Sequence, residues 1–558
     1  MQKLAELIAV LGLGALLVTC ALGLLRAARE RNGPRIIEAS LLLLLCVDGL
    51  RMWPEGVRFE QYPLTFTRML APLVALLFYR APERLLRALA WAAAALAVTL
   101  SLRSLYAARP GIGSVDFFAY LCWSRDLLDG FTETARQRFA YFPGVNLYWL
   151  AVMAWIGRSL ATVQWGFVTA LFAGAALCGA LVFRATRLWT LSLFCFATEL
   201  LFALATNGLQ GTGEPISVLP FLAGALIWCG SERPLRLVAL GVGIGAAIYC
   251  KQPAALLSLG WLALLFATPR ARWLPLLLVP VAAALSLCGL FALHGGMEAV
   301  HAGLRFLGAY PPEGTLLGNL REFSTGVQPL LFVSLLALLA WLWLALRRDP
   351  ALPRVAGFLL FSGLAALWQF RTRYHPHYGL YAIPCLLAGT AMLCAALWPR
   401  LELVQARRAA LAALLVIALG RLSTGAFVPL FAPGAPVPME SWPYGYPAEQ
   451  QLPSLGVASG ERAFVVPPER SAAHFLLGTV SAGWSRSYGD WGSAAPDDAM
   501  KAVRNPDVHL VIVRARATWQ KQDVIICGDL RCDDALALLG PSGFRKVAQG
   551  DDVEIWRR

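Results

Sequence analysis

The sequence predicts an all-α polytopic membrane protein with a small α/β domain at its C-terminal end. Of its 558 residues, 58% are hydrophobic and only 15% are Asp, Glu, Lys or Arg, whereas an ordinary soluble domain has about 25% charged residues. The apolar residues gather in long runs that short basic clusters separate. A single soluble globule and a disordered chain are therefore both excluded.

The basic charge has a second interpretation, which is binding to nucleic acid. The chain carries 48 Lys and Arg against 34 Asp and Glu, a net charge of +14. Its basic residues stand mainly between apolar runs, as the positive-inside rule describes for membrane proteins. We therefore expect membrane lipids, and not nucleic acid, among its partners.

The apolar runs are long enough for about fourteen membrane spans, since a spanning helix needs about 20 mainly apolar residues. The basic clusters between them agree with one orientation, with both chain ends outside and the clusters in the cytoplasm. The predicted spans are 4–25, 36–53, 65–79, 88–106, 163–183, 188–205, 215–229, 237–250, 254–268, 274–292, 327–346, 355–370, 378–397 and 409–426.

Residues 143–160 are also apolar enough to enter the membrane. If they crossed it, every later loop would change sides. We interpret them as a re-entrant segment or as part of a short helical pair, buried in protein or beside a wet cavity.

The composition changes after the last predicted span, and this change divides the chain into domains. We assign 1–430 to a transmembrane catalytic domain, 431–450 to a Pro-rich linker and 451–558 to a periplasmic α/β domain. Strand-like runs at 463–466, 509–513 and 553–556 and a helix-like run at 533–539 indicate its elements. Cys527 and Cys532, if they lie outside, are expected to form a disulfide.

The first large outer loop, residues 107–145, holds the main catalytic candidate. Asp116 opens a helical pattern in which aromatic and aliphatic residues share one face. Such a helix would lie in the membrane plane with that face toward the lipid. The plain structural alternative is that Asp116 only caps the helix.

This loop resembles the first outer loop of the GT-C glycosyltransferase superfamily, and most of all that of bacterial polyprenol-phosphate-mannose-dependent mannosyltransferases. The resemblance rests on Asp116-Phe-x-x-Tyr120-x-x-Trp123 and on Tyr141-Phe-Pro143. Lys251-Gln252-Pro253 matches a lysine-and-proline element that these enzymes carry some spans later. The resemblance thus implies a GT-C-like transmembrane fold.

It also implies an inverting transferase in the bacterial inner membrane. Such an enzyme moves a sugar, with mannose as one candidate, from a polyprenyl-phosphate donor to a lipid or glycan acceptor at the periplasmic face. The reaction needs a base for the acceptor hydroxyl and a cation for the leaving phosphate. We expect Asp116 to be the base and Lys251 to be the phosphate ligand, although a lysine at the end of a span can also simply snorkel.

A second cationic site is predicted at residues 369–378, where basic and aromatic side chains alternate. Arginine binds phosphate with paired hydrogen bonds, while an interfacial belt is the structural alternative. A metal pair at His375 and His377 is weakly supported, because a third ligand is missing. We expect no cofactor, and the sequence does not support a divalent metal. The predicted ligands here are Arg371, Arg373, His375, His377 and Tyr378, and the further substrate-binding residues are Tyr120, Tyr141, Gln210, Glu214 and Gln252.

Two other patterns receive structural interpretations. Glu199 lies inside an apolar span and is expected to pair with Arg184 or Arg187. The glycines of Gly241-Val-Gly243-Ile-Gly245 lie inside a span as well and indicate close helix packing, not a dinucleotide loop.

The sequence leaves other functions open. An O-antigen ligase-like transferase would use a diphosphate donor at the same face of the membrane. A transporter or flippase for a lipid-linked glycan would need two similar halves with broken helices, and the sequence has no such halves. A non-catalytic assembly subunit would use the C-terminal domain for docking.

Overall fold

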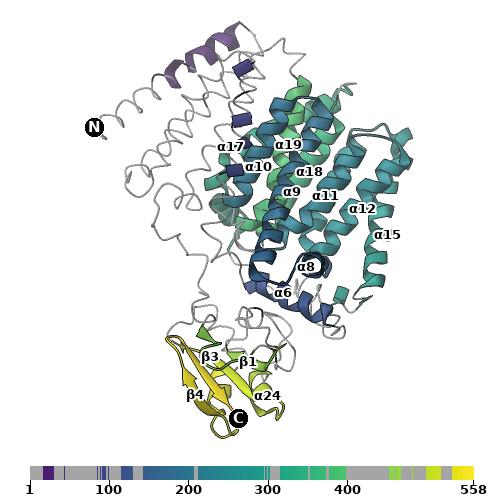
Figure 1. Ribbon diagram of the computed structural model, residues 1–558. Helices are drawn as coiled ribbons and strands as arrows, with labels where there is room; N and C mark the ends of the chain where they lie inside the picture. The colour runs from purple at the N-terminus through teal and green to yellow at the C-terminus, as the bar shows by residue number, and fades with distance from the viewer. Residues whose placement is uncertain are drawn as a thin grey trace.

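The computed structural model describes most of the chain after residue 114, and it shows a helical bundle with a small mixed sheet beyond one end (Figure 1). Before that point it describes the stretch 21–30, helical up to Arg29, and scattered helical residues. The described stretches are 115–129, 142–205, 212–294, 314–349, 352–371, 376–397, 451–458, 460–466, 498–516 and 531–558, with pieces of one to three residues between some of them.

The bundle is formed by helices whose buried apolar side chains, where the structure describes them, gather mainly in two large clusters. Polar caps start two of them, because Ser159 accepts a hydrogen bond from the Thr162 N–H and Thr315 accepts one from the Gly318 N–H. The helices are α9 (Leu160–Thr186), α10 (Trp189–Ala205), α11 (Glu214–Trp228), α12 (Pro234–Cys250), α13 (Gly260–Phe266), α14 (Trp273–Leu276), α15 (Leu278–Leu293), α17 (Leu316–Leu346), α18 (Arg354–Ala366) and α19 (Gly379–Leu397), with 3-10 turns η3 (Gln252–Leu259), η4 (Arg270–Arg272), η5 (Leu367–Arg371) and η6 (Pro376–Tyr378).

Among the described residues, three helical segments are long and apolar enough by themselves to cross a membrane, namely Leu160–Thr186, Arg270–Leu293 and Gly379–Leu397. The other apolar helical stretches, including Val333–Leu346 within α17, are shorter, so the predicted count of about fourteen spans stays a prediction. The predicted span 254–268 is occupied by the 3-10 helix η3, which continues into the short helix α13 as one apolar helical stretch, Gln252–Phe266. The predicted spans 36–53, 65–79 and 409–426 lie almost wholly outside the described residues.

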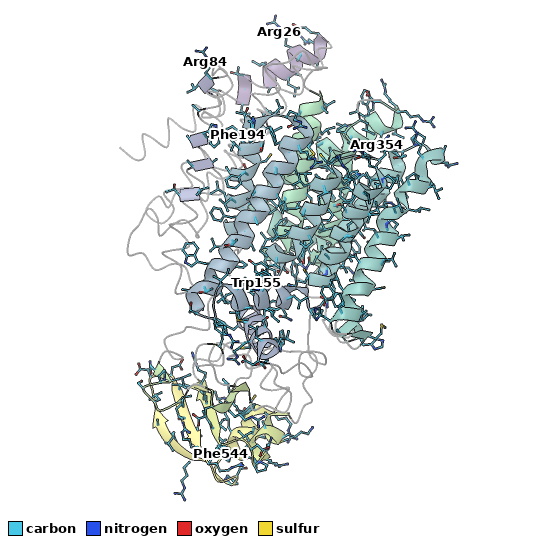
Figure 2. The ribbon with its side chains drawn as sticks, turned by 45° about the vertical axis from the view of Figure 1, so that its right-hand side comes forward. Arg26, Arg84, Trp155, Phe194, Arg354 and Phe544 are labelled. Carbon is cyan, nitrogen blue, oxygen red and sulfur yellow. The ribbon has the colours of Figure 1, made fainter. Side chains whose placement is uncertain are left out.

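The two ends of the bundle differ in their residues. Helices α6 (Val115–Leu128) and α8 (Gly144–Trp155) lie at the end nearer the sheet (Figure 1). Arg26, Arg84 and Arg354 lie at the opposite end, far from Trp155 (Figure 2). The described basic clusters thus share one end, as the positive-inside pattern predicts.

Helix α8 accounts for the segment 143–160, whose course the sequence left open. It has only 12 residues, too few to span a bilayer, and it lies with α6 across the end of the bundle (Figure 1). The interpretation as part of a short helical pair agrees with this placement.

Helices α11, α12 and α15 pack closely through the glycines that the sequence singled out. Gly241 and Gly245 of α12 lie against Ala282 and Ser286 of α15, while Gly243 lies against Gly224 of α11. Side chains at these glycines would collide with the neighbouring helices. The prediction of close helix packing is confirmed.

The C-terminal domain is a five-stranded sheet in the order β2-β1-β3-β5-β4. Parallel pairing joins β2, β1 and β3, and antiparallel pairing adds β5 and β4. Its elements are β1 (Arg462–Val466), β2 (Val480–Ser481), α24 (Asp498–Arg504), β3 (Leu510–Arg514), α26 (Cys532–Ala537), β4 (Arg545–Gln549) and β5 (Val553–Arg557).

The predicted strands near 463, 509 and 553 and the predicted helix near 533 are all present in this domain. Alternate residues of β1 and β3 build a core on each face of the sheet, and α24 and α26 cover one of the two. The expected disulfide is not formed, because Cys532 is a free, buried thiol. Its expected partner Cys527 and the predicted linker 431–450 lie beyond the residues that the structure describes, so the domain boundaries stay predictions.

Candidate functional site

Helix α6 carries Asp116 in its first turn, and the predicted helix is confirmed. The expectation of a one-sided interfacial helix was wrong, because Phe117 to Asp126 are all buried, and none of them is more than 8% exposed. Trp149 of α8 contacts Phe117, with ring centroids 5.4 Å apart, and Phe475 from the C-terminal region contacts Phe118 at 6.0 Å. Protein therefore covers the face that lipid or water would otherwise cover.

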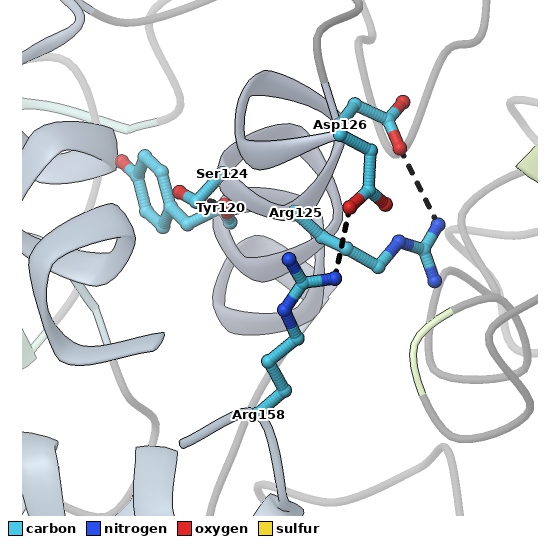
Figure 3. A network of polar contacts seen from close by, with 6 residues as sticks. Tyr120, Ser124, Arg125, Asp126 and Arg158 are labelled. Carbon is cyan, nitrogen blue, oxygen red and sulfur yellow. Dashed lines mark hydrogen bonds and ion pairs between the residues drawn. The ribbon is translucent and has the colours of Figure 1, made fainter. Parts of the chain in front are cut away.

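The two sides of α6 carry different polar groups (Figure 3). Tyr120 and Ser124 lie on one side, where the Ser124 hydroxyl is within 2.9 Å of the Asn146 carbonyl of α8. Arg125 and Asp126 lie on the other side, 3.5 Å apart. Arg158 reaches back from the loop after α8 to Asp129, at 2.8 Å. Hydrogen bonds and ion pairs thus hold α6 against α8.

A buried ion pair lies near α6, where α12 ends and α11 begins. Lys251 Nζ is 2.6 Å from Glu214 Oε1, and the two side chains are 3% and 0% exposed. Removing two charges from water costs more than such a pair usually returns. Packing alone therefore does not explain the pair, which suggests a functional role.

Glycines allow the surrounding elements to approach this pair closely. A Cβ atom on Gly213 would lie 3.3 Å from the Tyr120 hydroxyl and 3.5 Å from Lys251 Cδ. A Cβ atom on Gly144, the first residue of α8, would lie 2.7 Å from Cys250 Cα. Helices α6, α8, α11 and α12 therefore meet at one place.

The predicted cationic loop contributes some of its residues to this cluster. His377 Nε2 is 3.8 Å from Glu214 Oε1, and His377 is 8% exposed. Tyr378 packs edge-on against His377, with centroids 4.9 Å apart. Gln252, next to Lys251, is also buried.

Arg371 does not join the cluster. It is exposed and stacks on the indole of Trp368, 5.6 Å from the ring centroid. Its assignment as a phosphate ligand is not supported by this position, and the interfacial alternative describes it better.

Several predicted site residues fall where the structure gives no description. Tyr141, Gln210, Arg373 and His375 lie outside the described residues, and of Asp116 only the backbone is described. Their predicted roles stay predictions.

Sequence reasoning missed three polar contributors. Ser217, one turn after Glu214, has its hydroxyl 2.8 Å from the hydroxyl of Tyr381 in α19, and both residues are fully buried. Thr212, next to Gly213, and Asn146, two residues after Gly144, are also buried. The available signal was a polar residue close to a glycine at the start of an apolar run, which is common at any helix start.

Glu199 does not form the expected ion pair. It is 4% exposed in α10, and Oε2 has no hydrogen-bond partner among the residues described. Arg184 and Arg187 lie at the C-terminal end of α9, away from α6. Helix α10 begins beside them at Trp189 and runs back toward the α6 end, so that Glu199 lies ten residues farther along. Burial raises the cost of its charge, so a neutral carboxyl is expected there.

The fold of the chain is similar to that of solved structures of another protein. ArnT from Cupriavidus metallidurans bound to undecaprenyl phosphate matches with a TM-score of 0.53 at 15% identity, over 83% of this chain and 97% of that one. Its apo state matches with a TM-score of 0.56 at 14% identity, over 84% and 98%. The chain has the GT-C fold. No protein-family model and no curated protein matches the sequence.

The cluster lies at the α6 end of this fold. Helices α6 and α8 lie at one end of the bundle, and Glu214, Lys251 and His377 come from helix ends and turns at that end. Within the described stretches no three His, Cys, Asp or Glu residues gather as metal ligands. Asp116 and His375 are not covered by that observation, so metal dependence stays a matter for experiment.

Proposed function

We propose that this protein is an integral-membrane glycosyltransferase that uses a polyprenyl-phosphate-linked sugar. It would transfer that sugar to a lipid or glycan acceptor at the periplasmic face of the bacterial inner membrane. The observation that carries the proposal is the buried Lys251–Glu214 pair at the α6 end of a GT-C fold. In support, the ArnT structure that shares this fold holds undecaprenyl phosphate.

Lys251 has the chemistry of a phosphate ligand. Its ammonium has three N–H donors, and Glu214 Oε1 occupies one of them. The first turn of α8, whose N-cap is Pro143 without a side-chain cap, lies against the neighbouring Cys250. Since the N-terminus of a helix attracts anions, it would add to the attraction of Lys251 for a phosphate.

The proposed reaction balances without a cofactor. The acceptor hydroxyl oxygen attacks the anomeric carbon, and the bond from that carbon to the phosphate oxygen breaks. Its electron pair stays on the polyprenyl phosphate, where Lys251 stabilises the charge. The hydroxyl proton passes to the carboxylate of Asp116, and attack from the opposite side inverts the anomeric centre.

In this proposal Glu214, Ser217 and Tyr381 form a column of buried polar residues that holds Lys251 in position. Glu214 is bonded to Lys251 on one side, and Ser217 lies within 3.0 Å of the Glu214 carbonyl oxygen on the other. Tyr381 completes the column from α19. These contacts would hold the lysine near the phosphate instead of letting it reach toward water.

The experiment is a transfer assay with purified protein in lipid nanodiscs. Undecaprenyl phosphate carrying a radiolabelled sugar is supplied, with mannose tried first because of the loop motif. Asp116→Asn should lower turnover by about 10²- to 10⁴-fold, the usual contribution of a general base. Asp129→Asn is the matched control, because it changes an acid of the same helix region that is paired with Arg158.

Other results would select another function. Full activity of Asp116→Asn would exclude the proposed base. Consumption of a diphosphate donor alone would favour the O-antigen ligase-like alternative. Movement of the labelled lipid across the bilayer without release of undecaprenyl phosphate would favour a flippase. A chelator added to the same assay tests whether a divalent metal is needed.

A further inference from the structure

Asn146 of α8 is a polar side chain that the architecture does not explain. It is 0% exposed, and neither its amide oxygen nor its amide nitrogen has a hydrogen-bond partner within the described part of the chain. Leaving such groups unpaired costs about 1–3 kcal/mol. A leucine would fill a similar volume without that cost, so asparagine here calls for a ligand.

The backbone carbonyl of Asn146 accepts a hydrogen bond, whereas its side chain forms none with a described residue. The Ser124 hydroxyl lies 2.9 Å from the Asn146 carbonyl oxygen, which ties this turn of α8 to α6. The backbone is therefore fixed, and the unused bonding capacity belongs to the amide group alone.

The turn that carries Asn146 lies against the candidate site. Gly144 contacts Cys250, the residue before Lys251. The Val145 side chain would lie 3.0 Å from a Cβ atom placed on Gly213, the residue before Glu214. Asn146 therefore directly follows Gly144 and Val145, which both contact the site.

Two more buried polar atoms in this region make no well-formed hydrogen bond to a described residue, although their two side chains lie close enough to interact with each other. Glu214 Oε2 belongs to a residue that is 0% exposed, and Thr212 Oγ1 to one that is 2% exposed. Most buried polar groups in proteins are hydrogen-bonded. Unused groups on two neighbouring elements therefore indicate one shared ligand.

The chemistry of these groups fits sugar hydroxyls better than phosphate. An amide offers donors and an acceptor, a threonine hydroxyl offers both, and a carboxylate only accepts. Neighbouring hydroxyls on a sugar ring can satisfy all three, whereas a phosphate oxygen would be repelled by Glu214. Lys251 supplies the positive charge that phosphate needs.

We propose that Asn146, together with Thr212 and Glu214 Oε2, forms a hydroxyl-binding subsite for a sugar ring beside the phosphate ligand Lys251. This inference rests on the proposed function. The ring can belong to the donor or to a glycan acceptor, since both present the same hydroxyl chemistry.

The test compares binding of undecaprenyl phosphate alone with binding of undecaprenyl phosphate that carries mannose, glucose or galactose. In Asn146→Leu, the affinity for the bare lipid phosphate should stay within about twofold, while the gain from the preferred sugar should fall about tenfold, the equivalent of one lost hydrogen bond. If the ring is the acceptor's, donor binding stays unchanged and the KM for the acceptor rises about tenfold instead.

Asn319→Leu is the matched control. Asn319 is 7% exposed, and its amide donates to the Phe370 carbonyl at 2.8 Å. Its loss should lower the thermal midpoint of the ligand-free protein. Asn146→Leu should leave the midpoint unchanged or raise it, because it removes an amide with no partner in the part described.

The outcomes separate the subsite from the proposed function. If the wild type binds no undecaprenyl phosphate, both proposals fail. If the wild type binds it and Asn146→Leu changes neither sugar preference nor acceptor KM, only the subsite is excluded. The subsite is also excluded if Asn146→Leu lowers the midpoint as Asn319→Leu does and weakens binding of the bare lipid phosphate equally.

Discussion

The two ends of the helical bundle use charged residues in opposite ways. At the end near α6, Lys251 and Glu214 are paired and no more than 3% exposed. At the other end, Arg354 of α18 pairs with Glu232 in the loop before α12, and the two side chains are 28% and 50% exposed. The residue classes are the same, while their solvent surroundings differ completely.

This difference shows which charges serve chemistry. An exposed ion pair contributes about 0–1 kcal/mol and is screened by salt, so the arginine-rich end is explained by membrane orientation. A buried pair costs several kcal/mol in desolvation and is maintained only where the charge has a use. The position of a charge along the bundle therefore says more about its role than its residue type does.

The largest expected effect is at Lys251. Lys251→Met leaves Glu214 buried and uncompensated and should lower the free energy of unfolding by about 3–5 kcal/mol. It should also abolish transfer. Thermal unfolding and the transfer assay measure the two effects.

The double variant Lys251→Met/Glu214→Gln separates these two effects. It should recover most of the lost stability, because no charge remains buried, and it should still fail to transfer sugar. Transfer restored along with stability would mean that Lys251 is structural, and the contrast between the two ends would no longer hold.

The next largest effect is expected behind the pair. Tyr381→Phe removes the hydroxyl that lies 2.8 Å from the Ser217 hydroxyl, and should cost about 1 kcal/mol of stability. Because Ser217 keeps its contact with the Glu214 carbonyl, turnover should fall only a few-fold. A loss as large as that of Lys251→Met would show that Tyr381 itself takes part in the reaction.

Arg371 tests whether an exposed charge has no part in the reaction even when it lies at the α6 end of the bundle. It is exposed and stacked on Trp368, so Arg371→Gln should change kcat by less than about threefold, with a stability loss below the 0.5–1 kcal/mol typical of an exposed cation–π contact. A kcat loss of a hundredfold or more would return Arg371 to the phosphate site.

The smallest effect is expected for Glu232. The hydrogen bond from Arg354 lowers the pKa of the Glu232 carboxyl, so the pair stabilises the fold above the ordinary carboxyl pKa and loses this contribution as the pH falls through the lowered value. Because Glu232 is half exposed, Glu232→Gln should cost less than about 1 kcal/mol at pH 7. The difference from wild type should vanish in acid, and thermal midpoints over a pH series would show it.

The sequence was informative where one strong pattern decides the structure. Apolar runs predicted α9 to α12 and α19 to within a few residues, and β-branched runs predicted β1, β3 and β5. Hydropathy did not show that the first half of the apolar segment 254–268 is a 3-10 helix, because it does not separate a 3-10 helix from an α-helix.

For the site, residue type and loop position identified Lys251, Glu214 and His377 without showing that they meet. Their contact depends on how α11, α12 and α19 pack, which no local pattern contains. Asn146 and Ser217 were missed for the same reason, since a buried polar residue becomes conspicuous only when its possible partners are known. The cover over α6 by Phe475 joins residues far apart in the chain and could not be predicted.

The contact of Gly144 with Cys250 has a mechanical consequence. There is no space for even a methyl group between the two backbones, so the first turn of α8 and the last turn of α12 have to shift together. Anything that pushes on α8, whether a ligand at Asn146 or a neighbouring domain, would displace the lysine by a similar amount. Two helices that are far apart in the sequence therefore behave at this point as one rigid part.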